Sequence, residues 1–214
     1  MTNYIVSLAA AVALFTGACH AAETPATPKP AAAKPAAAAP AATPPPAAAA
    51  QRWVQAAGSS LTFTFDQEGA ASKGSFKQFS TELAYDEKSI AAGSLNVKIQ
   101  IASIDTQDQE RNDMLVTADL FDAQKFPTAQ YTASSLARTA AGGLEAVGKL
   151  TLRGVTHDLR LPLKIVPTAS GLELSGATAI KRLDYGVGQG DWKSTEGVAD
   201  EVKIQYKVAL VKAK

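Results

Sequence analysis

His157 is the one histidine that follows residue 50, so it is the first candidate for acid–base chemistry. Serine-based nucleophilic catalysis needs a histidine and a carboxylate within hydrogen-bonding reach of the serine. No spacing in the sequence would assemble such a set around His157. A single histidine after a turn is more often a surface or capping residue. We therefore predict that the protein is not an enzyme.

Two other motifs have the residue types of a binding site. Acidic side chains gather at Asp105, Asp108, Glu110 and Asp113, but their spacing lacks the glycine that a calcium loop requires. Carboxylates that complement a helix dipole are the simpler interpretation. The glycines at 186, 188 and 190 lack the Lys-Ser/Thr pair and the strand-to-helix context of a phosphate loop. The sequence thus predicts neither a metal ion nor a cofactor.

The first 22 residues are predicted to be a signal peptide. Their apolar run at residues 5–18 has the length of a secretory hydrophobic region and is short for a membrane span. Small residues follow the run, although residues 1–4 carry no Lys or Arg. We expect export, and an uncleaved apolar anchor is the alternative.

The only cysteine, Cys19, lies in this segment. Residues 51–214 therefore contain no disulfide and no cysteine-based metal or catalytic site. Thr16-Gly17-Ala18-Cys19 is similar to the cleavage box of bacterial lipoproteins, except that Thr16 stands where an aliphatic residue is usual. Cys19 is thus a candidate for lipidation, and a discarded signal-peptide cysteine is the other interpretation.

Residues 23–50 are expected to form a linker, because eight of the 11 prolines fall between Pro25 and Pro46 among alanines and threonines. Repeated proline favours an extended polyproline II chain. Residues 51–214 then form one domain of ordinary size. That domain holds 19 basic residues (21 in the chain less Lys29 and Lys34) and 19 acidic ones (20 less Glu23). Such a balance excludes the electrostatic footprint of a nucleic-acid-binding protein.

The domain is dominated by strands with one apolar face. Apolar and polar residues alternate at 61–65, 95–101, 159–165, 172–174 and 202–210, and weaker strands are expected at 76–85, 129–133 and 147–152. Residues 107–120 are rich in helix formers and predict one short helix between strands. Pro162 in a strand pattern predicts an edge or a bulge, and Gly148 and Gly176 predict bends or close approaches. About eight antiparallel strands with one apolar face can form a sandwich or a closed barrel.

Several ordered blocks of this sequence resemble the YceI-like family of polyisoprenoid-binding periplasmic proteins. The resemblance runs from about residue 53 to residue 210. Gly148-Lys-Leu-Thr-Leu-Arg-Gly-Val-Thr156 is similar to the family's G-x-L-T-I-R-G-V-T hairpin, and Arg182-Leu-Asp-Tyr-Gly-Val-Gly188 to its R-x-D-F-G-I-G block. Residues 103–113 and 119–131 match two further blocks.

The resemblance implies an all-β fold: an extended eight-stranded antiparallel, lipocalin-like β-barrel around a tunnel that binds long isoprenoid amphiphiles. It also implies a periplasmic location. Many members carry a histidine near the first hairpin, where this chain has Gln67. If that histidine meets the ligand's head group, Gln67 substitutes for it. Residues 188–192 are similar to a subgroup associated with membrane b-type cytochromes.

We therefore predict an apolar lipid ligand, either an isoprenoid quinone or a polyprenyl chain, held for transport or storage. Two alternatives stay open: a quinone-presenting accessory of a membrane cytochrome, and a filled-core interaction module without a ligand. The sequence also leaves open a homodimer. Arg182, Asp184 and Tyr185 are interpreted as structural residues that pin the loop before the last strand. The residues predicted to line the tunnel are Phe63, Phe65, Leu95, Val97, Ile99, Leu161, Leu163, Ile204 and Tyr206.

Overall fold

The computed structural model describes residues 50–213. The predicted signal peptide, Cys19 and all but the last residue of the predicted linker lie outside the described residues. No helix within residues 50–213 is long and apolar enough to cross a membrane.

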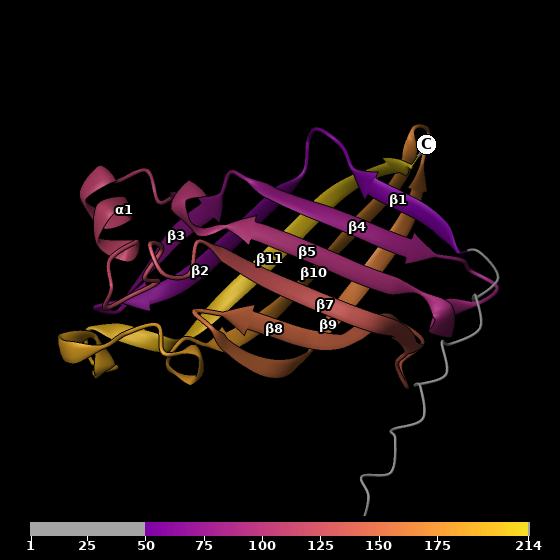
Figure 1. The fold of residues 1–214 in the computed structure, drawn as a ribbon. Helices are drawn as coiled ribbons and strands as arrows, with labels where there is room; N and C mark the ends of the chain where they lie inside the picture. The colour runs from indigo at the N-terminus through magenta and orange to yellow at the C-terminus, as the bar shows by residue number, and fades with distance from the viewer. Residues whose placement is uncertain (1–49, 214) are drawn as a thin grey trace, which may run out of the picture. The chain divides into compact units, whose positions relative to one another are not determined.

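Strands dominate the described residues, as the alternation predicts (Figure 1). The strands are β1 (Gln51–Gln55), β2 (Ser60–Gln67), β3 (Ala70–Phe76), β4 (Phe79–Tyr85), β5 (Ser94–Gln100), β6 (Ile104–Asp105), β7 (Thr128–Arg138), β8 (Leu144–Leu152), β9 (Val155–Thr168), β10 (Gly171–Lys181) and β11 (Val198–Lys212). The helices are α1 (Gln109–Leu115) and four short 3₁₀ turns: η1 (Ile90–Ala92), η2 (Ile101–Ser103), η3 (Leu183–Tyr185) and η4 (Gly190–Lys193).

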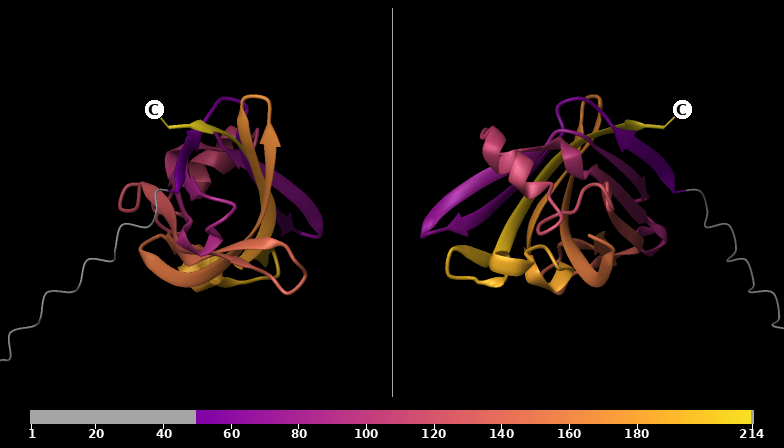
Figure 2. Two further views of the ribbon diagram at one scale, coloured as in Figure 1. Left: turned by 90° about the vertical axis from the view of Figure 1, so that its right-hand side faces the viewer. Right: turned by 60° about the vertical axis from the view of Figure 1, so that its left-hand side comes forward.

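Eight of the strands close into an antiparallel barrel. They follow one another in the order β1-β4-β5-β7-β8-β9-β10-β11, and the ring closes because β1 also pairs with β11. The view turned by 90° shows this ring of strands (Figure 2). The predicted eight-stranded barrel is thereby confirmed, and the sandwich alternative is wrong.

The remaining strands extend one end of the ring because β11 is long. Its residues 210–212 pair with β1, whereas residues 198–207 pair with β2, which in turn pairs with β3 and then β6. β1 and β3 were not expected, since QRWVQ and AASKGSF lack a clear alternation of apolar and polar residues. Two-residue turns with positive φ, Glu68–Gly69 and Arg153–Gly154, connect β2 to β3 and β8 to β9, as the twist of a hairpin requires.

Most of the later strands are longer than predicted, β10 for example spanning Gly171–Lys181 where 172–174 was expected, and two other boundaries differ for a local reason. The helix predicted over residues 107–120 occupies only Gln109–Leu115. It begins after Asp108, whose carboxylate accepts from the Arg111 amide, and it ends where the Thr117 hydroxyl donates to the Met114 carbonyl. The strand predicted over residues 76–85 breaks after Phe76, because the amides of residues 77 and 78 turn to Ser103.

One ladder of the barrel wall, between β9 and β10, stops well short of the length of its strands. Pairing between β9 and β10 runs from Thr168↔Gly171 to Lys164↔Ser175 and ends there. Residues 155–163 of β9 remain paired with β8, and residues 176–181 of β10 remain paired with β11. We call the boundary between these two stretches the β9–β10 seam. Pro162 lies in it, which confirms that this proline marks a strand edge.

The two mid-strand glycines mark close approaches of protein atoms. A Cβ added at Gly148 would lie 2.8 Å from the Ala133 Cα, at the bulge of β7 between Ala133 and Ser135. A Cβ at Gly176 would collide with the Pro162 carbonyl and with the Tyr206 ring. The Tyr206 side chain can therefore cross β10 at Gly176 because this residue has no side chain.

Candidate functional site

Two apolar cavities lie inside the barrel, with volumes of about 80 and 130 Å³. An engineered cavity of about 150 Å³ lined by Leu, Ile and Phe stays dry and accepts benzene. The larger cavity is therefore of a size to exclude water and accept one ring-sized apolar group.

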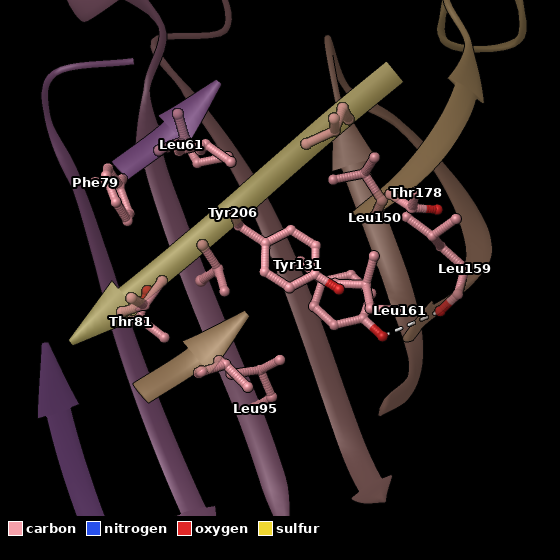
Figure 3. A pocket seen from close by; sticks show the side chains of 15 residues that line it. Leu61, Phe79, Thr81, Leu95, Tyr131, Leu150, Leu159, Leu161, Thr178 and Tyr206 are labelled. Carbon is pink, nitrogen blue, oxygen red and sulfur yellow. Dashed lines mark hydrogen bonds between the residues drawn. The ribbon is translucent and has the colours of Figure 1, made fainter. Parts of the chain in front are cut away.

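The smaller cavity, which we call the β9-side compartment, reaches from β9 across the barrel to β4 and β5 (Figure 3). Its lining side chains are almost all apolar. They are Leu61, Phe79, Thr81, Leu95, Val97, Ile99, Tyr131, Leu150, Leu159, Leu161, Leu174, Thr178, Ile204, Tyr206 and Val208.

The larger cavity, which we call the phenylalanine compartment, lies toward the β2–β3 end and is rich in aromatic rings. The Phe63 ring centroid lies 6.1 Å from that of Phe65 and 5.4 Å from that of Phe76, which lies 6.3 Å from that of Phe121. The remaining lining side chains are Leu61, Thr62, Ile99, Ile101, Ala129, Leu150, Leu152, Ile180, Arg182, Val187, Val198, Val202 and Ile204.

The two compartments adjoin. Leu61, Ile99, Leu150 and Ile204 line both of them. These four side chains come from four different strands and separate the two spaces. We call the two adjoining spaces together the tunnel, and these four residues its constriction.

The structure places eight of the nine predicted lining residues on this tunnel. Phe63 and Phe65 line the phenylalanine compartment; Leu95, Val97, Leu161 and Tyr206 line the β9-side compartment; Ile99 and Ile204 line both. Leu163 lines neither. It is buried in the hydrophobic core, to which Leu83, Leu172 and Leu210 also belong, near the end where β1 closes the ring.

Several lining residues were missed. Leu61 and Leu159 lie on the same faces as Phe63 and Leu161, so the alternation already contained the signal. Tyr131 lies in a strand that was predicted but not assigned to the lining. Thr81 and Thr178 gave no signal, because a polar residue on an inward face looks like an error in the pattern.

Tyr131 and Tyr206 present ring carbons to the tunnel and hide their hydroxyls. The Tyr131 hydroxyl lies 2.9 Å from the Ala146 carbonyl oxygen and 3.0 Å from that of Leu159. The Tyr206 hydroxyl donates to the Pro162 carbonyl. Burial raises the pKa of Tyr131 to about 12 and also raises the pKa of Tyr206; the charges of Glu145 and Tyr131, respectively, add to these shifts.

Burial of Tyr131 predicts an alkaline loss of stability. The unfolded chain gives up this proton near pH 10 and the folded chain only near pH 12. The Tyr131 contribution to the free energy of unfolding therefore falls by about 1.4 kcal/mol per pH unit as pH rises between these values. It does not change below pH 10. We expect Tyr131→Phe to make the free energy of unfolding fall less steeply over this range, as measured by urea unfolding. An unchanged slope would contradict the prediction.

Thr81 on β4 is 1% exposed, and its hydroxyl has no hydrogen-bond partner. An unsatisfied buried hydroxyl costs about 1–3 kcal/mol. Valine has nearly the same shape and favours strands. Thr81→Val should therefore raise the free energy of unfolding by about 1 kcal/mol and the melting temperature by about 2–4 °C.

The control for this prediction is Thr132→Val on the exposed face of β7, where the hydroxyl bonds to the Asn96 side chain at 3.0 Å. It should change the free energy of unfolding by less than about 0.5 kcal/mol. A Thr81→Val protein less stable than the wild type would show that this hydroxyl has a partner in solution.

Arg182 closes the far side of the phenylalanine compartment and is 5% exposed. All five of its N–H groups are satisfied at 2.7–3.1 Å by backbone carbonyls, those of Val187, Trp192, Ser194, Val198 and Ala199. Burial lowers the pKa of Arg182, and the Asp200 carboxylate partly offsets this shift. The interpretation of Arg182 as the residue that pins this loop is confirmed.

A hollow of about 240 Å³, which we call the vestibule, adjoins the phenylalanine compartment. The two spaces share Phe65, Arg182 and Val198. The other vestibule residues are mostly polar and come from β2, from α1 with the residue that caps it, from the loop after α1, and from η4. They are Gln67, Asp108, Glu110, Arg111, Met114, Leu120 and Trp192. The apolar interior thus adjoins, at this end of the barrel, a hollow that also has charged and amide side chains in its lining.

His157 and the acidic cluster have structural contacts. His157 Nε2 lies 3.0 Å from the Asp184 carbonyl oxygen, and its ring lies edge-on to that of Tyr185. Asp108 caps α1, and Asp105 accepts from the Gln107 amide and pairs with Lys77. Within residues 50–213, no three His, Cys, Asp or Glu side chains meet in a way that could hold a metal ion.

A family model described as "YceI-like domain" matches residues 53–210. Protein YceI of Escherichia coli O157:H7 is 38% identical over 93 residues, which are 44% of this chain and 48% of that protein. The chain spans about half the length of the curated relatives it matches.

Two solved structures have the same fold. BcnA of Burkholderia cenocepacia has a TM-score of 0.67 and 32% identity, with 70% of this chain and 94% of that chain covered. A polyisoprenoid-binding domain from Saccharophagus degradans, implicated in plant cell wall breakdown, has a TM-score of 0.62 and 16% identity, over 77% and 99% of the two chains. At 16% identity the second likeness shows the fold alone.

Proposed function

This chain belongs to the YceI-like family, and from that premise we propose that it binds one long isoprenoid-type amphiphile, an isoprenoid quinone or a polyprenyl chain, for transport or storage. The observation that carries the proposal is the tunnel. Its two compartments are lined by apolar side chains from across the barrel, and its tyrosine hydroxyls are turned to backbone carbonyls. Apart from the Thr81 hydroxyl, which has no hydrogen-bond partner, the described contacts of this lining offer a hydrocarbon chain an apolar surface.

The size of the tunnel adds a requirement. The compartments of about 80 and 130 Å³ are small for a whole polyprenyl chain, since drug-sized ligands occupy pockets of about 300–1,000 Å³. Lining side chains must therefore change rotamer to admit a long ligand. That cost, with the ordering of the chain, offsets much of the roughly 0.8 kcal/mol that each buried methylene contributes.

The vestibule suits the head group. Its two carboxylates, Asp108 and Glu110, oppose a negatively charged head. Arg111 lies 3.8 Å from Asp108, and Arg182 has no free N–H group. The Gln67 amide can donate to and accept from a neutral group. These contacts favour a quinone or an alcohol head over a diphosphate.

We place the protein in the periplasm, on the basis of the signal peptide predicted over residues 1–22 and the linker that follows. We also propose that it binds its ligand without transforming it. No observation among residues 50–213 favours the membrane cytochrome or the homodimer, and both stay predictions.

Native mass spectrometry of protein purified from the bacterial envelope without detergent tests the proposal. We expect a co-purifying mass of an isoprenoid quinone or polyprenol that disappears when the protein is unfolded. Repeated absence of any lipid, together with no uptake of an added isoprenoid alcohol, would favour an interaction module without a ligand.

A further inference from the structure

The β9–β10 seam lies directly over the β9-side compartment. Leu159 and Leu161 from β9 and Thr178 from β10 line that compartment from the two sides of the seam. Ile180, also on the seam stretch of β10, lines the phenylalanine compartment. The β9–β10 ladder stops after five register pairs, and residues 155–163 of β9 and 176–181 of β10 then run on without pairing to each other. The seam is thus a stretch of wall that backbone pairing does not close, with apolar space behind it.

Side chains bound the seam at both ends. Near Lys164 and Ser175, where the ladder stops, Tyr206 reaches from β11 over Gly176, and its hydroxyl donates to the Pro162 carbonyl on β9. At the opposite end, His157 of β9 bonds to the Asp184 carbonyl of η3, just after β10. Beyond the end of the backbone ladder, one side-chain bond at each end of the seam therefore joins β9 to the β10–β11 side.

The shape of the tunnel favours entry of a ligand chain through the barrel wall over entry from the vestibule. Beyond the β9-side compartment the barrel is filled by buried residues, among them Leu83, Leu172 and Leu210. A chain entering from the vestibule would have to pass the constriction at Leu61, Ile99, Leu150 and Ile204 end first. A chain entering through the seam can move in side-on and occupy both compartments.

We infer that the β9–β10 seam is a lateral portal through which the apolar chain enters and leaves the tunnel, with the Tyr206–Pro162 hydrogen bond as its latch. The inference rests on the proposed function. Opening requires loss of one side-chain hydrogen bond and separation of the last rungs of a short ladder. Neither step breaks the β8–β9 or β10–β11 ladders that flank the seam.

A disulfide across the last rung tests the portal. Lys164 and Ser175 are register partners on β9 and β10, and facing Cα atoms in an antiparallel pair lie about 4.5–5.5 Å apart, within the span of a disulfide. Lys164→Cys with Ser175→Cys is made in a Cys19→Ser chain, which removes the only native cysteine. The matched control joins β9 to its other neighbour, through Lys149→Cys with Asp158→Cys.

The measurement is an exchange rate. Protein loaded with deuterated geranylgeraniol is chased with an excess of the unlabelled alcohol, and native mass spectrometry follows the bound label with time. We expect oxidation of the Lys164–Ser175 pair to slow exchange at least about tenfold and reduction to restore it. The control disulfide should leave the rate within about twofold. Tyr206→Phe, which lacks the latch hydroxyl, should speed exchange at least about threefold.

The outcomes separate the portal from the proposed function. Normal loading with an exchange rate that the Lys164–Ser175 disulfide does not change would overturn the portal, leave the lipid-binding proposal intact, and direct attention to the vestibule as the route. Failure of the wild-type protein to load geranylgeraniol or any longer isoprenoid would overturn both.

Discussion

Replacing Arg182 with methionine should lower the free energy of unfolding by about 3–5 kcal/mol, because it leaves several buried backbone carbonyls without a donor. Five carbonyls between Val187 and Ala199 receive their hydrogen bonds from this one guanidinium. Methionine fills a similar volume but donates nothing. The loop from η3 to the start of β11 should then detach, and with it one wall of the phenylalanine compartment.

Denaturant unfolding measures this effect, with Arg160→Met as the control. Arg160 is exposed and pairs with Glu145 on the barrel surface, so its loss should cost less than about 1 kcal/mol. Arg182→Lys keeps the charge but has three donors in place of five, and should fall between the other two variants. An Arg182→Met protein within 1 kcal/mol of the wild type would mean that these carbonyls find other donors.

Replacing Ile204 with tryptophan should separate the two compartments and reduce affinity for long isoprenoids at least about 100-fold, because only one compartment then stays available to the chain. A 100-fold loss corresponds to about 2.7 kcal/mol, which is the burial of only three to four methylenes. Ile204 is chosen because it lines both compartments. A ten-carbon alcohol such as geraniol, which after rotamer changes of the lining side chains needs only one compartment, should lose much less affinity.

Titration of each alcohol, followed by intrinsic fluorescence or native mass spectrometry, measures the change. Gln205→Trp is the matched control, since its side chain is exposed on the outer face of the same strand. Overpacking at Ile204 should cost about 1–3 kcal/mol of stability, so circular dichroism must show that the barrel is intact. Equal losses for the two chain lengths would show that the constriction does not divide the binding space.

Much of the tunnel could be predicted because its signal is local. Leu95, Val97 and Ile99, or Ile204 and Tyr206, identify an inward face through alternation alone. The choice between barrel and sandwich could not be made in this way, because both bury the same faces. That choice depends on β1, a five-residue strand without a clear pattern, which pairs with both β4 and β11.

The vestibule and the seam could not be predicted for a different reason. Gln67, Arg111 and Trp192 come from segments far apart in the sequence, and only the fold brings them to one mouth. The seam depends on where a ladder stops, and Pro162 was its one sequence signal. Leu163 shows that alternation can also assign too many residues to the tunnel. It shares an inward face with Leu161, yet it packs into the filled core.

The interrupted β9–β10 ladder also bears on aggregation. Two unpaired strand edges can template pairing with a strand of another chain, which is a common origin of aggregation. The β9 edge is guarded against this: Pro162 has no N–H to offer, and Asp158, Arg160 and Lys164 place charged, exposed side chains along the outer face. The stretch of wall that we propose as a portal is thereby a poor template for a foreign strand.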